Sequence, residues 1–295
     1  MSAGIFYIVD VFAIDRYTGN PLAVFVNAEG LSGLEMQAIA KEMNYSETTF
    51  IMGERQSDRG YPVRIFTPKK ELPFAGHPTL GTAYILQQYV TQERQSSLAL
   101  NLKVGQIPVT VELGEDGEEL FWMKQNTPTF QQELSPQSLA EVLSLPSDAI
   151  DRNFPIQEVS TGVPFIIVPL KEHQPLKQIK IRKEEYFALI ENTEAKAILT
   201  FCPETNFPEN QLSVRVFCDA FGIPEDPATG SANGCLAGYL AQYGYFGDRP
   251  LDIRVEQGYE IDRPSLLFLK ATKTQQTIDV FVGGKVIEIA KGEWS

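Results

Sequence analysis

Cysteine is scarce in this chain of 295 residues, which has only three. Cys202, Cys218 and Cys235 are widely spaced, and no C-x-x-C pair is present. This pattern argues against a disulfide framework and against a thiol-based redox or metal motif. We expect all three to behave as small buried hydrophobic residues.

Positive charge is also scarce, with 25 Lys and Arg residues against 38 Asp and Glu and a formal net charge of −13. Nucleic acids and anionic membranes both attract basic surfaces, and no basic run exists here, so we expect neither partner. Long apolar runs are missing too: "PFIIVPL" is far too short to span a bilayer. The N-terminal "MSAGIFYIVDVFAID" lacks a basic segment, which predicts a strand rather than a signal peptide, and therefore a cytoplasmic protein.

Four short patterns occur twice, in the same order and at nearly constant spacing. The pairs are "TGNPLAVFV" from Thr18 and "TGVPFIIVP" from Thr161, "TTF" from Thr48 and "LTF" from Leu199, "VRIF" from Val63 and "VRVF" from Val214, and "AGHPTLGTAYIL" from Ala75 and "TGSANGCLAGYL" from Thr229. The series predicts an internal duplication with domains at residues 1–127 and 128–295. The last strand, "KVIEIAKG", falls in the second domain, with packing on the first as the alternative.

Each half predicts the same elements. A T-G-x-P turn separates two strands, because Gly and Pro fix the bend between β-branched and aromatic runs. We expect a helix next, starting near Ser32 or Gly33 in "SGLEMQAIAKEMN" and given by "SPQSLAEVLSL" in the second half. The VR(I/V)F strand, a loop and a second helix follow, and "IPVTVEL" and "TIDVFVGG" close the halves as hairpins.

In the second helix of the first half, "TLGTAYILQQYV", the apolar residues do not form one stripe, and its counterpart "GCLAGYLAQYGYF" is apolar nearly all round, which predicts burial. We therefore expect an α+β fold in which each half is a β-barrel-like sheet wrapped around a central helix. Gly81, Gly234 and Gly238 would let strands approach these helices closely.

Small residues crowd the start of both helices, at Gly76-His77 and at Gly230-Ser231. A helix N-terminus offers free N–H groups and a partial positive charge, so it binds a carboxylate without a lysine. If a pseudo-two-fold axis relates the halves, both N-termini face one cleft between the domains. The bare backbone there would give an acidic protein its local positive field.

Only two histidines are present. His173, in "LKEHQPLK", is expected to be a solvated loop residue. His77 could simply cap its helix, or it could hydrogen-bond a substrate or carry a proton. We favour the second role because its repeat partner, Ser231, is also polar.

Two carboxylates stand close to these helix starts. Glu47, in "NYSETTF", enters an apolar strand, and the repeat assigns it the aliphatic partner Ile198. Such asymmetry favours a catalytic role over a capping one. Asp226, before Pro227, suits an Asx-turn or a site residue equally well.

Other motifs fail. "GHPTLGT" lacks the G-K-[ST] ending of a phosphate loop, and Thr229 takes the first glycine position of a nucleophile elbow. No H-E-x-x-H motif, Cys/His cluster or G-x-G-x-x-G after a strand occurs. We expect neither a metal nor a cofactor.

Taken together, "NYSETTF", "FTPKKELPFAGHPTLGTA", "TGVPF" and "EDPATGSANG" resemble the PhzF-like family of phenazine biosynthesis, within the diaminopimelate epimerase-like fold. The resemblance covers essentially the whole chain. It implies cofactor-free isomerisation by proton transfer on a small carboxylic acid, a site in the interdomain cleft, and a homodimer.

Carried over by position, the resemblance makes Glu47 the acid/base group and Ser46 a substrate contact. Gly76 and His77 then form one helix N-terminus, Gly230 and Ser231 the other, and Asp226 is the aspartate of "DPATG". Epimerases of the wider fold use a pair of cysteines at these N-termini, and this chain has none there, which disfavours a two-thiol racemase.

Two functions remain in view. The first is an isomerase in which Glu47 moves the proton, His77 and Asp226 assist, and Ser231 anchors the substrate, with a Glu47 pKa brought toward the working pH by burial. The second is a non-catalytic small-molecule binding or interaction protein on the same fold. The Glu47, His77 and Asp226 set favours catalysis.

Overall fold

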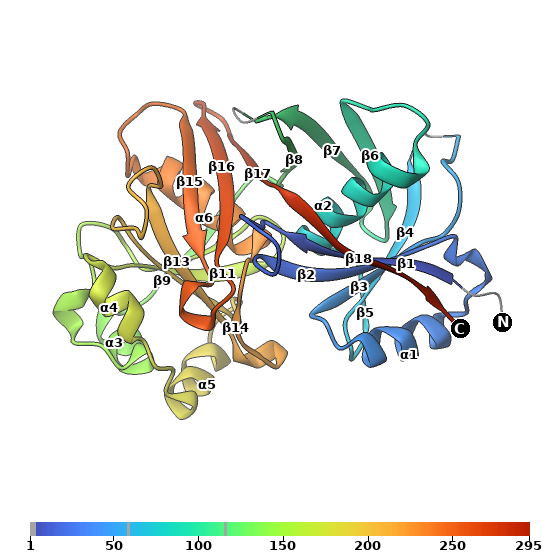
Figure 1. The fold of residues 1–295 in the computed structure, drawn as a ribbon. Coiled ribbons are helices and arrows are strands. Elements are labelled where there is room, and N and C mark those ends of the chain that lie inside the picture. The colour runs from blue at the N-terminus through green and yellow to red at the C-terminus, as the bar shows by residue number, and fades with distance from the viewer. Residues whose placement is uncertain (1–3, 58–59, 115–116) are drawn as a thin grey trace. The chain divides into compact units, whose positions relative to one another are not determined.

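The computed structural model describes residues 4–57, 60–114 and 117–295 (Figure 1). The chain separates into two compact units. Unit 1 holds Met1–Met123 and Gly283–Ser295, and unit 2 holds Lys124–Val282. The chain thus returns to unit 1 for its final strand, whereas the sequence placed the domain boundary at residues 127 and 128.

The described elements of unit 1 follow one another from β1 to α2, then from β6 to β8, and end with β18. Their bounds are β1 (Gly4–Val11), β2 (Asn20–Val26), the 3-10 helix η1 (Ala28–Gly30), α1 (Gly33–Met43), β3 (Glu47–Ile51), β4 (Tyr61–Phe66), β5 (Glu71–Leu72), α2 (Gly76–Ile85), the π-helix η2 (Leu86–Val90), β6 (Ser97–Leu102), β7 (Gly105–Leu113), β8 (Glu119–Lys124) and β18 (Val286–Trp294).

The strands of unit 1 pair in a mixed order. β1 lies between β18 and β2, antiparallel to both. β2 pairs with β3 in parallel, β3 with β4 antiparallel, and β4 with both β5 and β6. β6, β7 and β8 continue as antiparallel neighbours, as the alternation of "IPVTVEL" predicted.

Helix α2 is the buried helix of unit 1. Every residue of α2 except Tyr84 is buried, and the helix packs against β1, β2, β3, β6, β7 and β18. Gly81 makes the approach possible, because a Cβ there would lie 2.6 Å from Leu22 and 2.9 Å from Val11. The expected closeness at this glycine is confirmed.

Helix α1 lies on the other side of β3, as Figure 1 shows. Ser32 caps it in a capping box: Ser32 Oγ accepts a hydrogen bond from the Glu35 backbone N–H, and the Glu35 carboxylate accepts one from the Ser32 backbone N–H. The buried face of α1 packs on a stack of aromatic rings. This cluster contains Ala23, Phe25, Ala28, Met36, Ile39, Ala40, Phe50 and Phe66.

Unit 2 begins with β9 and ends with β17. Its elements are β9 (Thr129–Glu133), α3 (Pro136–Leu143), the 3-10 helix η3 (Ser147–Ala149), β10 (Gln157–Ser160), β11 (Pro164–Pro169), α4 (His173–Gln178), α5 (Lys183–Glu191), β12 (Ile198–Cys202), β13 (Leu212–Cys218), the 3-10 helix η4 (Asp219–Phe221), β14 (Ile223–Asp226), α6 (Gly230–Tyr243), β15 (Leu251–Gln257), the 3-10 helix η5 (Tyr259–Ile261), β16 (Ser265–Lys273) and β17 (Ile278–Gly284).

Pairing in unit 2 runs in the same sense as in unit 1. β10 pairs with β9 and β11, β11 pairs with β12 in parallel, and β12 pairs with β13 antiparallel. β13 then pairs with β14 antiparallel and with β15 in parallel, and β15 with β16 antiparallel. Each pairing from β10 to β16 has its counterpart among β1 to β7.

Helix α6 is the buried helix of unit 2 and packs against β10, β11, β15 and β16. Gly238 faces Pro128, and Gly234 faces Gln125, at 2.7 and 2.9 Å from the position of a Cβ. These two glycines therefore accommodate the segment between β8 and β9 rather than a sheet strand. A second core lies under α3 and α5 and includes Leu139, Leu143, Tyr186, Ile190 and Ile198.

Two sequence assignments were wrong. The helix "SPQSLAEVLSL" forms as α3, but it precedes β10, and the helices that follow the T-G-x-P turn in unit 2 are α4 and α5. The partner of Glu47 also differs. Thr48 pairs with Phe66 as Ile198 pairs with Phe217, so Glu47 corresponds to Ala197 and the TTF/LTF echo is one residue out of register.

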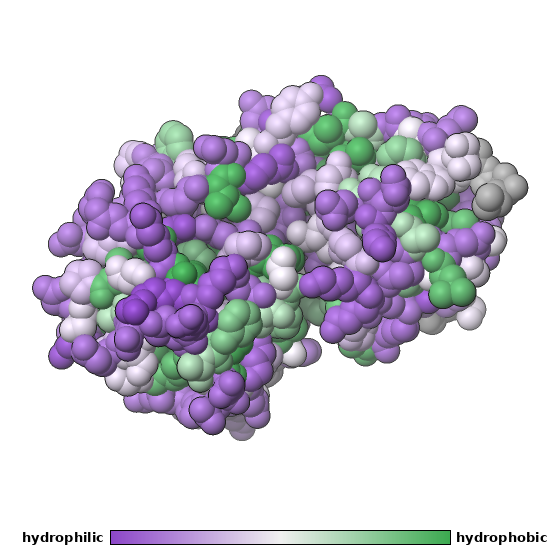
Figure 2. All heavy atoms as spheres, turned by 90° about the horizontal axis from the view of Figure 1, so that it is seen from below, coloured by the Kyte–Doolittle hydropathy of each residue, from purple (hydrophilic) through white to green (hydrophobic). Residues whose placement is uncertain are grey.

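Among the described residues, no helix is long and apolar enough to cross a bilayer. Hydrophilic side chains cover most of the face shown in Figure 2, with hydrophobic ones scattered between them. This surface agrees with a chain in which charged residues make up 21% of the sequence.

Candidate functional site

Glu47 is the first residue of β3. Helix α1 ends at Met43, and Asn44 takes a left-handed conformation with φ 54° that turns the chain back toward the sheet. Ser46 lies half-buried in this turn. Glu47 then pairs with Leu22 of β2, so the turn and the ladder together fix its position.

His77 is the second residue of α2, and the start of this helix is left open. The N-cap residue Ala75 has no side chain to bind the first N–H groups, and Pro78 has no N–H at all. Thr79 donates from Oγ1 to the Ala75 carbonyl at 2.7 Å and so does not cap them either. The N–H groups of Gly76 and His77 therefore have no side-chain cap.

The structure brings Glu47 and His77 together. Nε2 of His77 lies 3.4 Å from Oε2 of Glu47, and the two side chains are 7% and 15% exposed. Such a distance suggests an ion pair, but burial lowers the pKa of His77 to about 3. The imidazole is therefore neutral near pH 7, and the contact joins a neutral ring to a carboxyl group.

A second contact between β3 and α2 lies beside the first. Thr82 donates from Oγ1 to Oγ1 of Thr49 at 2.8 Å, and both residues are fully buried. Thr49 is two residues after Glu47, so it is on the same face of β3. This hydrogen bond ties the strand to the helix next to the Glu47–His77 contact.

The remaining predicted residues lie in unit 2. Asp226 ends β14 and is 8% exposed, and its Oδ2 accepts a short hydrogen bond from the Thr229 hydroxyl. Gly230 and Ser231 begin α6, whose N-cap Thr229 makes no side-chain cap. Gly230 is buried and Ser231 half-buried. The N-terminus of α6 is thus open like that of α2.

Sequence reasoning missed Gln257, at the end of β15. Its Nε2 donates to the Asp226 carbonyl at 2.8 Å and to Thr229 Oγ1 at 3.1 Å. Its Oε1 accepts from Thr229 N at 3.2 Å and from Asn233 Nδ2 at 2.8 Å. No local pattern marks Gln257, because its partners lie 24 to 31 positions away in the sequence.

The expectation for His173 was wrong. It is not a solvated loop residue but the first residue of α4, half-buried, with an Nε2 atom that is out of contact with solvent. Its backbone N–H donates to Glu204 Oε2 at 2.7 Å. His173 therefore has a structural place in unit 2.

The cysteines are buried, as expected. Burial raises the pKa of Cys235, inside α6, to about 11 and that of Cys202 to about 12. Neither thiol is poised to ionise near neutral pH. Among the described residues, no three His, Cys, Asp or Glu side chains group to hold a metal ion.

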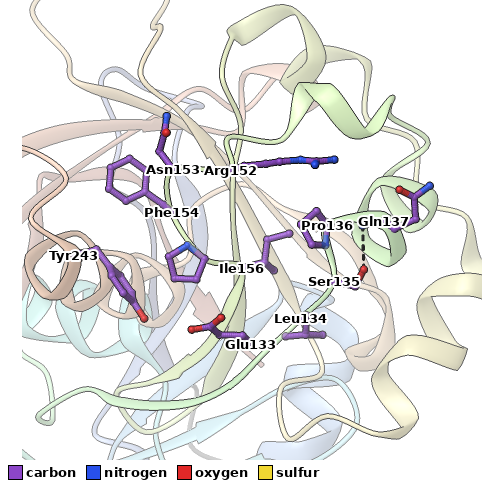
Figure 3. A pocket seen from close by; sticks show the side chains of 11 residues that line it. Glu133, Leu134, Ser135, Pro136, Gln137, Arg152, Asn153, Phe154, Ile156 and Tyr243 are labelled. Carbon is purple, nitrogen blue, oxygen red and sulfur yellow. Dashed lines mark hydrogen bonds between the residues drawn. The ribbon is translucent and has the colours of Figure 1, made fainter.

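Two surface hollows of about 680 and 660 Å³ lie elsewhere, one in each unit. The hollow in unit 2 is lined by Glu133, Arg152 and Tyr243 among others, and Figure 3 shows the Arg152 side chain extending away from Tyr243. Neither hollow is lined by Glu47, His77 or Asp226. The chemistry assigned to those residues gives the stronger argument for a site than the size of these hollows.

The model of the family described as "Phenazine biosynthesis-like protein" matches residues 9–292. The chain belongs to this family. The resemblance inferred from its motifs is therefore confirmed. Within the family it is 36% identical over 290 residues to the trans-2,3-dihydro-3-hydroxyanthranilate isomerase of Pseudomonas fluorescens, covering 97% of this chain and 98% of that protein.

Solved structures agree with this membership. The crystal structure of a PhzF-family phenazine biosynthesis protein of Bacillus anthracis aligns with a TM-score of 0.92 at 29% identity, over 100% of both chains. A hydroxyproline epimerase of Agrobacterium vitis aligns with a TM-score of 0.60 at 8% identity, covering 99% of this chain and 92% of that one, a likeness of fold alone. This chain, like its relatives, therefore has a mixed fold of helices and sheet and is an enzyme of the isomerase class.

Proposed function

We propose that this protein is a cofactor-independent isomerase that moves a proton on a small cyclic or amino carboxylic acid. One observation carries the proposal. A mostly buried carboxyl group, Glu47, contacts a neutral imidazole, His77, at a helix start with no side-chain cap. These three features supply a proton carrier, a hydrogen-bonding partner and a binding place for an anion.

Glu47 is the proton carrier. In the first step its carboxylate takes a proton from a carbon next to a π-system or carboxylate, and the C–H electron pair passes into that conjugated system. In the second step the protonated Glu47 returns the proton to another atom of the same substrate, and a new bond to hydrogen forms there. The atoms balance without any co-reactant.

His77 assists as a neutral group. Because burial lowers its pKa to about 3, only one of the two ring nitrogens carries a hydrogen. The ring therefore offers one donor nitrogen and one acceptor nitrogen. A neutral ring 3.4 Å from Glu47 can hydrogen-bond either form of that carboxyl group without trapping it as an ion pair. This suits a group that must both take up and release the proton.

The substrate carboxylate binds at the start of α2, where the N–H groups of Gly76 and His77 stabilise the charge that builds up during transfer. Ser46, beside Glu47, contacts the substrate. In unit 2, Asp226 hydrogen-bonds the same substrate, and Gly230 and Ser231 anchor it at the start of α6. A site shared by the two units is part of this proposal.

We also infer that the units arose by duplication, each as a barrel-like sheet around its central helix. The equivalent arginines support this inference. Arg64 of β4 binds Glu71 through two hydrogen bonds of 2.7 and 2.9 Å, and Arg215 of β13 binds Glu225 at 2.8 and 2.7 Å. Each guanidinium also lies over the ring of the phenylalanine two positions later in the chain. The distance to the ring centroid is 5.0 Å for Arg64 and Phe66 and 4.9 Å for Arg215 and Phe217.

Proton exchange in heavy water tests the proposed function. We would incubate the protein with trans-2,3-dihydro-3-hydroxyanthranilate, the compound in the name of the relative, and with a panel of small cyclic and amino carboxylates. NMR would follow deuterium uptake and isomer formation. We expect at least one acid to exchange at carbon and isomerise. Binding without exchange across the panel would instead indicate the non-catalytic alternative.

A further inference from the structure

Gln257 is almost fully buried, at 1% exposure, and its side-chain amide makes four hydrogen bonds. The end of β15, which carries Gln257, packs closely against the loop that follows Asp226. At the next residue, Gly258, φ is +81° and a Cβ would lie 2.6 Å from the Pro227 carbonyl oxygen. Only glycine fits there, so the end of β15 holds Gln257 in one place.

The partners of Gln257 fix which way its amide points. The Asp226 carbonyl can only accept, so the nitrogen must face it, and the Thr229 N–H can only donate, so the oxygen must face that group. Exchanging the amide oxygen and nitrogen would place like groups against each other at both contacts. The orientation of this amide is therefore determined by backbone groups.

That orientation in turn fixes the Thr229 hydroxyl. Nε2 of Gln257 donates a hydrogen to Thr229 Oγ1, so the hydroxyl's own proton is directed to its other partner, Asp226 Oδ2. A donated hydrogen bond at Oδ2 favours the ionised carboxylate and holds its plane in one orientation.

We propose that Gln257 is a positioning residue that acts on Asp226 through the Thr229 hydroxyl, so that Asp226 meets the substrate as an oriented, ionised acceptor. The assignment rests on the proposed role of Asp226. It adds a residue 31 positions from that aspartate in the sequence, with no expected substrate contact of its own. Gln257 and Thr229 then form one functional unit with Asp226.

Gln257→Met and Thr229→Val test the assignment. Methionine keeps the length of Gln257 but makes none of its four hydrogen bonds, and valine removes only the hydroxyl. The side-chain carboxyl carbon of Asp226 would be followed by NMR against pH in each variant and in the double variant. Glu225, the residue before Asp226, and Arg215, which binds Glu225, are kept throughout.

Each single variant should raise the titration midpoint of Asp226, because a charge-stabilising hydrogen bond is lost or misdirected. The double variant should match Thr229→Val alone, because Gln257 acts through the hydroxyl. The matched control is Gln87→Met, which removes another buried glutamine whose amide bonds Gln95 in unit 1. It should leave Asp226 unchanged.

An unchanged midpoint in Gln257→Met, or equal and additive shifts in the double variant, would overturn the proposal and leave Gln257 a purely structural residue. If Gln257→Met does not fold, Thr229→Val alone decides. An unchanged Asp226 midpoint in that variant would show that the Thr229 hydroxyl does not act on Asp226, and the proposal would fail. The measurement needs no substrate. A failure of the proposed isomerase activity would therefore be seen separately, in the exchange experiment.

Discussion

Nε2 of His77 lies 3.4 Å from Oε2 of Glu47, although one is the second residue of α2 and the other is the first residue of β3. The contact depends on the first turn of a helix lying against the first residue of a strand. Because the imidazole is buried and neutral, its low pKa should affect the stability of the fold as well as the chemistry of the site.

Stability should fall in acid because of His77. Its pKa is about 3 in the folded chain and near 6.5 when unfolded, so the unfolded state binds more protons between those values. The stabilisation is present above pH 6.5 and is lost as pH falls toward 3, by about 1.4 kcal/mol per pH unit. Urea unfolding of the wild type and His77→Asn at several pH values measures it. The variant should show a correspondingly smaller slope, and equal slopes would contradict burial as the cause.

Gly81→Ala should destabilise unit 1 by about 1–3 kcal/mol, because the new methyl group would overlap Leu22 and Val11 in a packed core. Gly30→Ala is the control, since a Cβ there meets nothing within 4 Å. Thermal and urea unfolding of both variants check the prediction. A neutral Gly81→Ala would mean that α2 packs less tightly on β1 and β2 than the structure describes.

A small aromatic carboxylate should bind at the helix starts. We would titrate 3-hydroxyanthranilate into labelled protein and follow backbone amide shifts. The amides of Gly76, His77, Gly230 and Ser231 should move first, and raised salt should weaken binding only modestly because no surface lysine is needed. Shifts that gather instead around exposed Lys and Arg residues would refute the helix-terminus account.

Local patterns predicted much of this structure. Apolar residues all round "GCLAGYLAQYGYF" predicted a buried helix, and α6 is one. T-G-x-P predicted the turns between β1 and β2 and between β10 and β11. These features depend on neighbours in the sequence, so the sequence carries them directly.

Features that depend on register or distant partners were harder to infer. Aligning TTF with LTF placed the correspondence between the halves one residue out of register. Only the strand pairing defines which residues correspond. Gln257 escaped notice because a glutamine at a strand end has no local signature. The closeness of Glu47 and His77 followed from family resemblance rather than from periodicity. Their catalytic roles, the homodimer and the substrate stay predictions.

His77→Asn should slow proton exchange by roughly 10- to 100-fold, the cost of a hydrogen bond to a charged group. Asparagine keeps a donor and an acceptor but does not reproduce the position of Nε2. Single-turnover exchange on the acid identified in the screen measures this effect. A loss as severe as that in Glu47→Gln would show that His77 relays the proton itself.

Glu47→Gln tests the central claim most directly. Glutamine keeps the shape of Glu47 but takes up no proton, so single-turnover exchange should fall by about 10²–10⁴-fold or more. Affinity by calorimetry should change little, and stability should hold or rise because a charge leaves a mostly buried site. Glu42→Gln, on the exposed side of α1, is the control and should exchange at the wild-type rate. Normal exchange by Glu47→Gln would contradict the account, and an equal loss of affinity and rate would make Glu47 a binding residue instead.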